Sequence, residues 1–257
     1  MTRVRAAVAA ALTCWLALTS CSGPGRPDAE DGAPRPLTAE EADRVALARF
    51  ATYRRGTGNV TMTIPSRGRT VTLTGRIDWR RHLGYAEIRA DSESSARELI
   101  QWNFTSVTTR PDWPGGLPKR PPATGWETHR LTPHGSPLDA ALLLLLNLGT
   151  DRPDNAQLLA RSSARLVRQD HVAKAPVIVV AGPAAPTAGA DRSELGNTRY
   201  WIDDDGRLLR FSARAGGESA WMTAELPQSP ADPLPSPPPA LTQAALAPPS
   251  SPPATPS

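Results

Sequence analysis

The chain of 257 residues contains only two cysteines, Cys14 and Cys21. Cys14 lies within an apolar N-terminal segment, and loss of that segment would leave Cys21 as the single thiol. A single thiol cannot form an intramolecular disulfide, so a disulfide framework is excluded as a source of stability. A free thiol in an exported protein also invites side reactions unless it is modified.

Catalytic and metal-binding motifs are absent as well. The sequence has no GxSxG elbow, no phosphate-binding loop, no HExxH and no CxxC. His129 and His134 are five residues apart across Pro133, which is not a helical spacing for metal ligands. The acidic run Asp203–Asp205 lacks the spaced ligands of a calcium loop and, followed by Gly206, favours a hairpin turn. We therefore expect a protein that is not an enzyme and has no metal site and no cofactor.

Lysine occurs only at Lys119 and Lys174, so arginine supplies nearly all of the positive charge. The arginines are spread along the chain and interleaved with acidic residues, whereas nucleic-acid binders gather them into a stripe. The formal net charge is only +4. The composition therefore argues against a nucleic-acid partner.

The apolar run nearest the N-terminus is too short to span a bilayer, which takes about 20 residues. It extends from Ala6 to Leu18, follows Arg3 and Arg5, and ends in small residues. A basic start, a short apolar run and small residues predict a secretory signal peptide over residues 1–20. We therefore expect an exported protein.

The segment Leu18-Thr19-Ser20-Cys21 resembles the lipobox of bacterial lipoproteins. The resemblance implies that the Cys21 thiol receives a diacylglyceryl group, that the chain is cut before Cys21, and that an acyl chain such as palmitate is added to the new amine. Two or three acyl chains hold a protein stably on a membrane. The predicted location is the outer face of the cytoplasmic membrane. The alternative is an ordinary secreted protein with a coincidental cysteine.

Composition divides the remaining chain into three parts. Residues 21–36 are rich in glycine, proline and charge, which predicts a flexible tether. Residues 37–226 carry the periodic apolar patterns of one folded domain. Residues 227–257 are rich in proline, alanine and serine, which predicts a disordered tail.

Apolar periodicity places the helices and strands of the domain. Thr38 followed by Glu41 is a capping-box pattern, and helical spacing continues to Tyr53. From Asn59 the period changes to two, which predicts antiparallel strands with one apolar face each. Strands are expected at residues 59–65, 70–79, 84–90, 98–107 (one or two strands), 125–131, 164–170, 172–181, 197–203, 207–213 and 219–226. A proline- and glycine-rich loop covers residues 112–124, and a short helix is expected at 151–159.

Residues 136–148 form the most apolar stretch after the signal peptide. Ser136 can cap a helix, Pro137 suits its first turn, and Gly149 can end it. Leu142 to Leu146 place leucine on every side, so the helix must be buried on nearly every side. A helix surrounded by a curved sheet would satisfy that requirement.

This order of elements resembles the LolA/LppX/LprG-like superfamily of envelope lipoproteins and lipid carriers. The resemblance covers roughly residues 37–226 and rests on three stretches, Gly75–Ile88, Pro137–Gly149 and Tyr200–Arg210. It implies an α+β fold with a strongly curved antiparallel sheet, an incomplete β-barrel, and helices packed at its open side. It also implies an apolar cavity between sheet and helices. The long loop after Trp113 and the proline-rich tail depart from the smallest carriers.

The carrier hypothesis makes the membrane and a lipid or other apolar ligand the expected partners. The ligand would be buried between one face of the sheet and the leucine-rich helix. The expected lining residues are Val60, Met62, Ile64, Val71, Leu73, Ile77, Trp79, Leu142, Leu143, Leu145 and Leu146. Trp113 and Trp126, which flank the loop, are candidates for the lip of the cavity, for contact with the membrane surface, or for ordinary loop packing. The alternative is an anchored interaction or sensor module with a filled core that binds another envelope protein.

Overall fold

The computed structural model describes residues 33–91, 97–133, 135–184, 195–215, 219–234 and 241. Cys21, the predicted signal peptide, and most of the predicted tether and tail lie outside these residues, as does His134. The chain divides into two units, Met1–Glu30 and Asp31–Ser257, and the fold is that of the second unit. Within the described residues, no helix is both long enough and apolar enough to cross a membrane.

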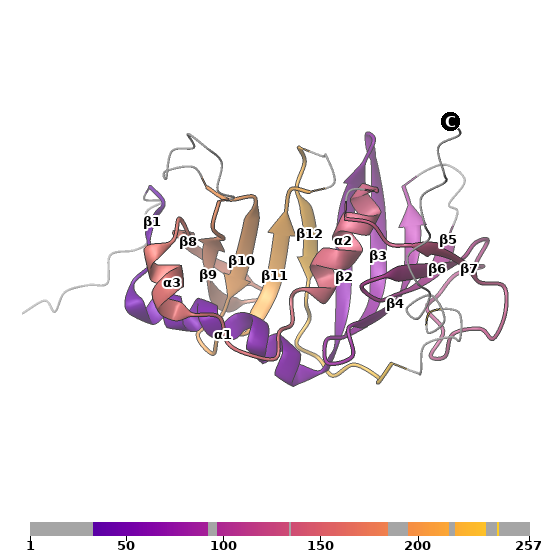
Figure 1. Ribbon diagram of the computed structural model, residues 1–257, viewed down its shortest axis with the longest axis horizontal. Coiled ribbons are helices and arrows are strands. Elements are labelled where there is room, and N and C mark those ends of the chain that lie inside the picture. The colour runs from indigo at the N-terminus through magenta and orange to yellow at the C-terminus, as the bar shows by residue number, and fades with distance from the viewer. Residues whose placement is uncertain are drawn as a thin grey trace, which may run out of the picture. The chain divides into compact units, whose positions relative to one another are not determined.

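One antiparallel sheet of twelve strands forms the fold (Figure 1). Its strand order is β1-β8-β9-β10-β11-β12-β2-β3-β4-β5-β6-β7, so β1 and β7 are edges and the sheet does not close on itself. This confirms the predicted α+β class with an open antiparallel sheet. The strands are β1 (Arg35–Pro36), β2 (Thr57–Ser66), β3 (Arg69–Asp78), β4 (Leu83–Ala90), β5 (Arg97–Trp102), β6 (Ser106–Arg110), β7 (Glu127–Arg130), β8 (Arg165–Val172), β9 (Ala175–Ala181), β10 (Thr198–Ile202), β11 (Leu208–Ala213) and β12 (Met222–Glu225).

Three helices lie over the same face of this sheet (Figure 1): α1 (Ala39–Arg55), α2 (Pro137–Leu146) and α3 (Ala156–Arg161). The capping box at the start of α1 is formed, because the Thr38 hydroxyl accepts from the Glu41 amide and the Glu41 carboxylate accepts from the Thr38 amide. Ser136 caps α2 through the Asp139 amide. Local sequence therefore fixes where both helices begin.

The main core lies between the helices and the inner face of the sheet, the face toward the helices. Two tryptophans fill its centre, and each lies against a glycine of a neighbouring strand. A Cβ on Gly58 would come within 2.5 Å of the Trp79 ring, and one on Gly84 within 2.1 Å of the Trp102 ring. Glycine is therefore required at these two positions because any side chain would displace a buried ring.

The opposite, outer face of the sheet is covered in part by residues 227–234, which we call the C-terminal strap. The Arg81 guanidinium donates to the Leu234 carbonyl at 2.6 Å, and that of Arg55 donates to the Ser229 carbonyl at 3.1 Å. Leu234 is buried against Tyr85 and Leu99. The structure thus differs from the composition-based prediction, which placed these residues in the disordered tail. Side chains at the end of α1 and in the turn between β3 and β4 bind the strap through its backbone carbonyls, which composition does not reveal.

A similar difference occurs at the N-terminal boundary of the domain. Arg35 and Pro36, predicted as the end of the tether, form β1 and pair with Leu166 and Arg165 of β8. The Arg35 guanidinium also forms an ion pair with Glu41 at 2.7 Å. The folded unit therefore includes at least two residues that composition assigned to the tether.

Candidate functional site

The residues predicted to line a cavity form a packed core beneath α2. Nine of the eleven are buried, and Val71 and Leu143 are half-buried beside them. The Trp79 Nε1 donates to the Leu145 carbonyl at 2.9 Å, and the Trp102 Nε1 donates to the Leu142 carbonyl at 3.1 Å. These bonds hold α2 directly against the sheet.

Trp113 and Trp126 lie on the other face of the sheet. They pack against the buried cluster of Tyr85, Leu99 and Leu234. Their indole nitrogens donate within their own loop, to the carbonyls of Gly116 and Pro122 at 2.7 and 2.8 Å. Both tryptophans therefore hold the proline-rich loop on the outer face, away from the helices.

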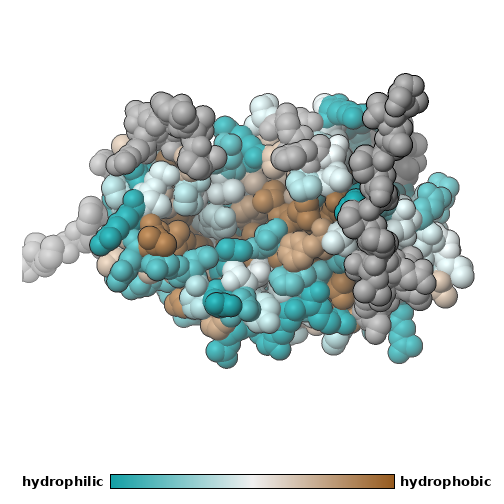
Figure 2. Space-filling model, in the orientation of Figure 1, coloured by the Kyte–Doolittle hydropathy of each residue, from teal (hydrophilic) through white to brown (hydrophobic). Residues whose placement is uncertain are grey.

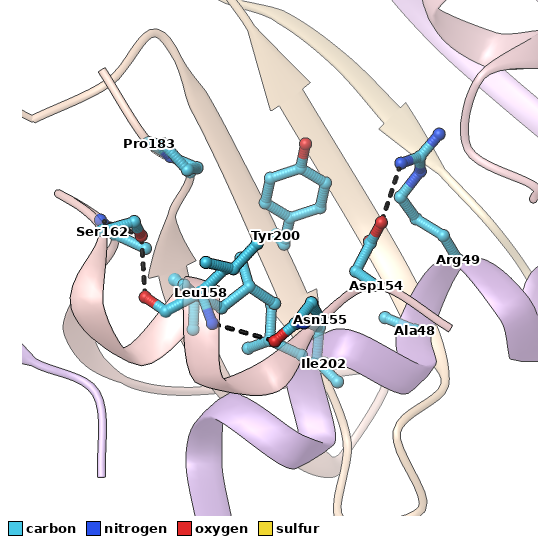
Figure 3. A pocket seen from close by; sticks show the side chains of 14 residues that line it. Ala48, Arg49, Asp154, Asn155, Leu158, Ser162, Pro183, Tyr200 and Ile202 are labelled. Carbon is cyan, nitrogen blue, oxygen red and sulfur yellow. Dashed lines mark hydrogen bonds and ion pairs between the residues drawn. The ribbon is translucent and has the colours of Figure 1, made fainter. Parts of the chain in front are cut away.

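An apolar pocket of about 370 Å³ opens elsewhere, between α1, α3 and strands β8–β10 (Figure 3). None of the eleven predicted lining residues contributes to it. Tyr200 and Ile202 of β10 form its floor, Ala48 of α1 lies on one side, and Leu158 of α3 lies on another. The pocket is lined by Val45, Ala48, Arg49, Asp154, Asn155, Leu158, Leu159, Ser162, Ala164, Val180, Gly182, Pro183, Tyr200 and Ile202.

The mouth of the pocket carries an exposed leucine. Leu158 is 66% exposed, and α3 has no buried residue at all. Figure 2 shows hydrophobic surface at α3 and over α2, surrounded by hydrophilic residues. Asn155 caps α3 by accepting from the Leu158 amide at 3.0 Å, which fixes the position of this leucine. A ligand entering the pocket would cover apolar surface that is now in water.

Arg49 and Asp154 place a charged pair on one side of the pocket, and Asn155 and Ser162 add uncharged polar side chains. The Arg49 guanidinium forms an ion pair with Asp154 at 3.3 Å and donates from Nε to the Asn147 carbonyl at 3.0 Å (Figure 3). Burial raises the pKa of the Tyr200 phenol above its ordinary value, so the phenol stays neutral at physiological pH. The arrangement offers an apolar interior with one charged pair at its edge, as ligand pockets commonly do.

Small residues create this space. Ala48, Ala164 and Gly182 are the smallest of the residues that line it. In the sequence, the available signal is a pair of leucines, Leu158 and Leu159, in a short and otherwise polar helical segment. That signal is weak because one helix turn with two leucines also describes ordinary core packing.

The described part of the chain shows no cluster of metal-binding side chains. Groups of three or more histidine, cysteine, aspartate or glutamate side chains that could hold a metal ion do not occur there. The acidic run forms the predicted turn, in which Asp203 accepts from the amides of Asp205 and Arg207 at 3.1 and 2.8 Å. These carboxylates therefore have a structural role in the β10–β11 hairpin.

The protein therefore consists of one open antiparallel sheet with a small apolar pocket beneath its helices. Among solved structures, the chain is similar to the lipoprotein LppX of Mycobacterium tuberculosis, at 12% identity and a TM-score of 0.41, over 74% of this chain and 97% of that one. It is also similar to a DUF1329 family protein from Desulfovibrio piger, at 11% identity and a TM-score of 0.22, over 74% and 88%. No family model matches the chain, and no curated protein matches it.

Proposed function

We propose that this protein is an exported lipoprotein, anchored through acylated Cys21, that binds a lipid or another apolar molecule in the pocket between α1, α3 and β8–β10. The observation that carries the proposal is the apolar pocket with an exposed leucine at its mouth. The lipobox resemblance at Leu18–Cys21 supports the anchor. The protein acts by binding and not by catalysis.

The size of the pocket narrows the class of ligand. Ligand pockets span roughly 300–1,000 Å³, and this one, at about 370 Å³, lies near the lower end. One acyl chain or a compact apolar molecule suits this volume better than a lipid with several chains. The Arg49–Asp154 pair at the edge would face a polar headgroup, while the chain lies against Val180 and Ile202.

The test is binding of a fluorescent single-chain fatty acid to the chain from Ser22 to Ser257, with Leu158→Asp as the variant. We expect micromolar binding by the unchanged protein. The variant should bind about tenfold more weakly, because roughly 1.5 kcal/mol of apolar burial is lost at the mouth. Native mass spectrometry with organic extraction would identify any lipid that co-purifies.

Leu47→Asp is the matched control. Leu47 is also an exposed helical leucine, 45% exposed on α1, but it does not line the pocket. Its substitution should leave the affinity unchanged. Absence of binding by the unchanged protein, or equal loss in both variants, would contradict the proposed pocket.

A second function is favoured by the packing beneath α2. There the two indole hydrogen bonds to the carbonyls of Leu142 and Leu145 hold the helix close to the sheet. A filled core suits an anchored interaction or sensor module whose surface binds another envelope protein. A bare protein mass, unchanged after incubation with envelope lipids, would favour this module over the carrier.

A further inference from the structure

Four arginines and two tryptophans lie together on the outer face of the sheet, in β8, β10 and β11 and at the ends of the connection between β11 and β12, and we call them the arginine–tryptophan patch. Inner and outer positions alternate along each strand, and Tyr200 and Ile202 line the pocket on the inner face, so Arg199 and Trp201 lie outward. The patch consists of Arg168, Arg199, Trp201, Arg210, Arg214 and Trp221.

Trp221 lies between two guanidinium groups. The Arg214 guanidinium carbon is 4.4 Å from the centroid of the Trp221 ring, and that of Arg199 is 4.9 Å from it. Both distances are within the range of cation–π attraction. The ring thus holds two like charges close together on the surface.

These two charges have no acidic partner among the described residues. Arg168 pairs with Asp170 at 3.1 Å, and Arg210 pairs with Glu225 at 2.5 Å. The Arg199 guanidinium, in contrast, donates to the backbone carbonyls of Gly196 and Thr198, and the Arg214 guanidinium lies over the Trp221 indole. The patch therefore carries two uncompensated positive charges.

Burial and the neighbouring arginines both contribute to a lowered pKa of Arg199. Burial, followed by the neighbouring guanidinium groups of Arg214 and Arg168, lowers the pKa of Arg199 below its ordinary value. An anion placed over Trp221 would relieve the repulsion between these arginines and accept charge-assisted hydrogen bonds from both sides. Arg214 is exposed and Trp221 is half-buried, so both can reach such a group.

We propose that the arginine–tryptophan patch binds the phosphate groups of anionic phospholipids and so orients the domain on a membrane surface. Guanidinium groups pair well with phosphate, and tryptophan favours the boundary between water and lipid. The inference goes beyond the ligand pocket, which lies on the opposite face of the sheet.

The connection of the domain to its tether supports this orientation, a step that rests on the proposed anchor at Cys21. The tether ends in β1, which pairs with Leu166 and Arg165 of β8. Arg168 of the patch follows on the same strand. A membrane anchor attached through this tether would therefore join the domain at the edge of the sheet nearest the patch.

The test is co-flotation of the chain from Ser22 to Ser257 with phosphatidylcholine vesicles, with and without about one third phosphatidylglycerol. This chain lacks Cys21, so the result is independent of lipidation and of the pocket. We expect binding only to the anionic vesicles. Binding should be lost near 1 M salt, where the screening length falls to about 3 Å.

The decisive variant is the double change Arg199→Gln and Arg214→Gln, with thermal unfolding measured to confirm that it folds. Its affinity for anionic vesicles should fall roughly 30-fold, as expected for two basic residues at the surface. The matched control is Arg69→Gln with Arg89→Gln, which removes the same charge from two exposed arginines outside the patch. Equal loss in both double variants, or no binding of the unchanged chain to anionic vesicles, would overturn the proposal.

Discussion

At the scale of single residues, two tryptophans determine how closely the sheet and α2 approach each other. Trp79 and Trp102 are fully buried, and each donates its indole hydrogen to a carbonyl of α2. Sequence alternation correctly predicts that Trp79 lies on the inner face. It cannot predict that the ring will bond to α2, because that bond depends on the separation of two elements distant in sequence.

Replacing Trp79 with phenylalanine tests this contact. The change leaves space in the core and removes the donor to the buried Leu145 carbonyl, so we expect a loss of about 2–4 kcal/mol in the free energy of unfolding. Urea unfolding measures it. Trp126→Phe is the control, because Trp126 is half-buried and donates only within its loop. Its effect should stay below about 1 kcal/mol, and equal effects would contradict the assigned role of Trp79.

At the scale of elements, helices and strands could be predicted from local periodicity, but the pocket could not. The capping box at Thr38 and the alternation in residues 59–79 both correspond to observed elements, α1 and the β2–β3 hairpin. The expected cavity and the observed pocket occupy different halves of the sheet. A gap between two packed surfaces depends on side-chain volumes across the interface, such as those of Ala48 on α1 and Val180 on β9, which a single sequence does not bring together.

The C-terminal strap contributes to the stability of the fold, which its proline-rich composition does not indicate. Leu234→Ala should lower the free energy of unfolding by about 2–3 kcal/mol, because Leu234 is buried against Tyr85 and Leu99. Thermal or urea unfolding measures the change. Leu47→Ala, on an exposed helix position, should change it by less than about 0.5 kcal/mol. A negligible effect of Leu234→Ala would mean that the strap is not part of the cooperative unit.

At the scale of the whole molecule, two glutamates give opposite contributions to the pH dependence of stability. A hydrogen bond from Arg35, aided by the Thr38 amide, lowers the pKa of Glu41 below its ordinary value of 4.5. Burial raises the pKa of Glu98 above the same value, partly offset by His129. The stabilisation from Glu41 is therefore fully present above pH 4.5 and is lost as the pH falls through its lower folded-state pKa. Ionised Glu98 is unfavourable in the folded state; that cost decreases as the pH falls through its raised folded-state pKa and is absent below 4.5.

Glutamine variants separate the two effects. Glu41→Gln should reduce the free energy of unfolding at pH 7 and have little effect well below pH 4.5. Glu98→Gln should increase it at pH 7 and likewise lose its effect in acid. Urea unfolding of both variants across this pH range measures the difference. Parallel curves for the two variants would contradict the assigned directions.

The position of β12 in the sheet affects the order in which the chain can fold. β12 lies between β11 and β2, so Thr223 pairs with Thr63 across more than half the chain. The hairpins on either side are local and can form early, but the two halves of the sheet cannot join until β12 is available. Pairing at such separation is slow because a long loop must close first. During synthesis, the strand edge of β2 therefore stays open until almost the last folded segment emerges, and this interval is when the chain is most exposed to aggregation.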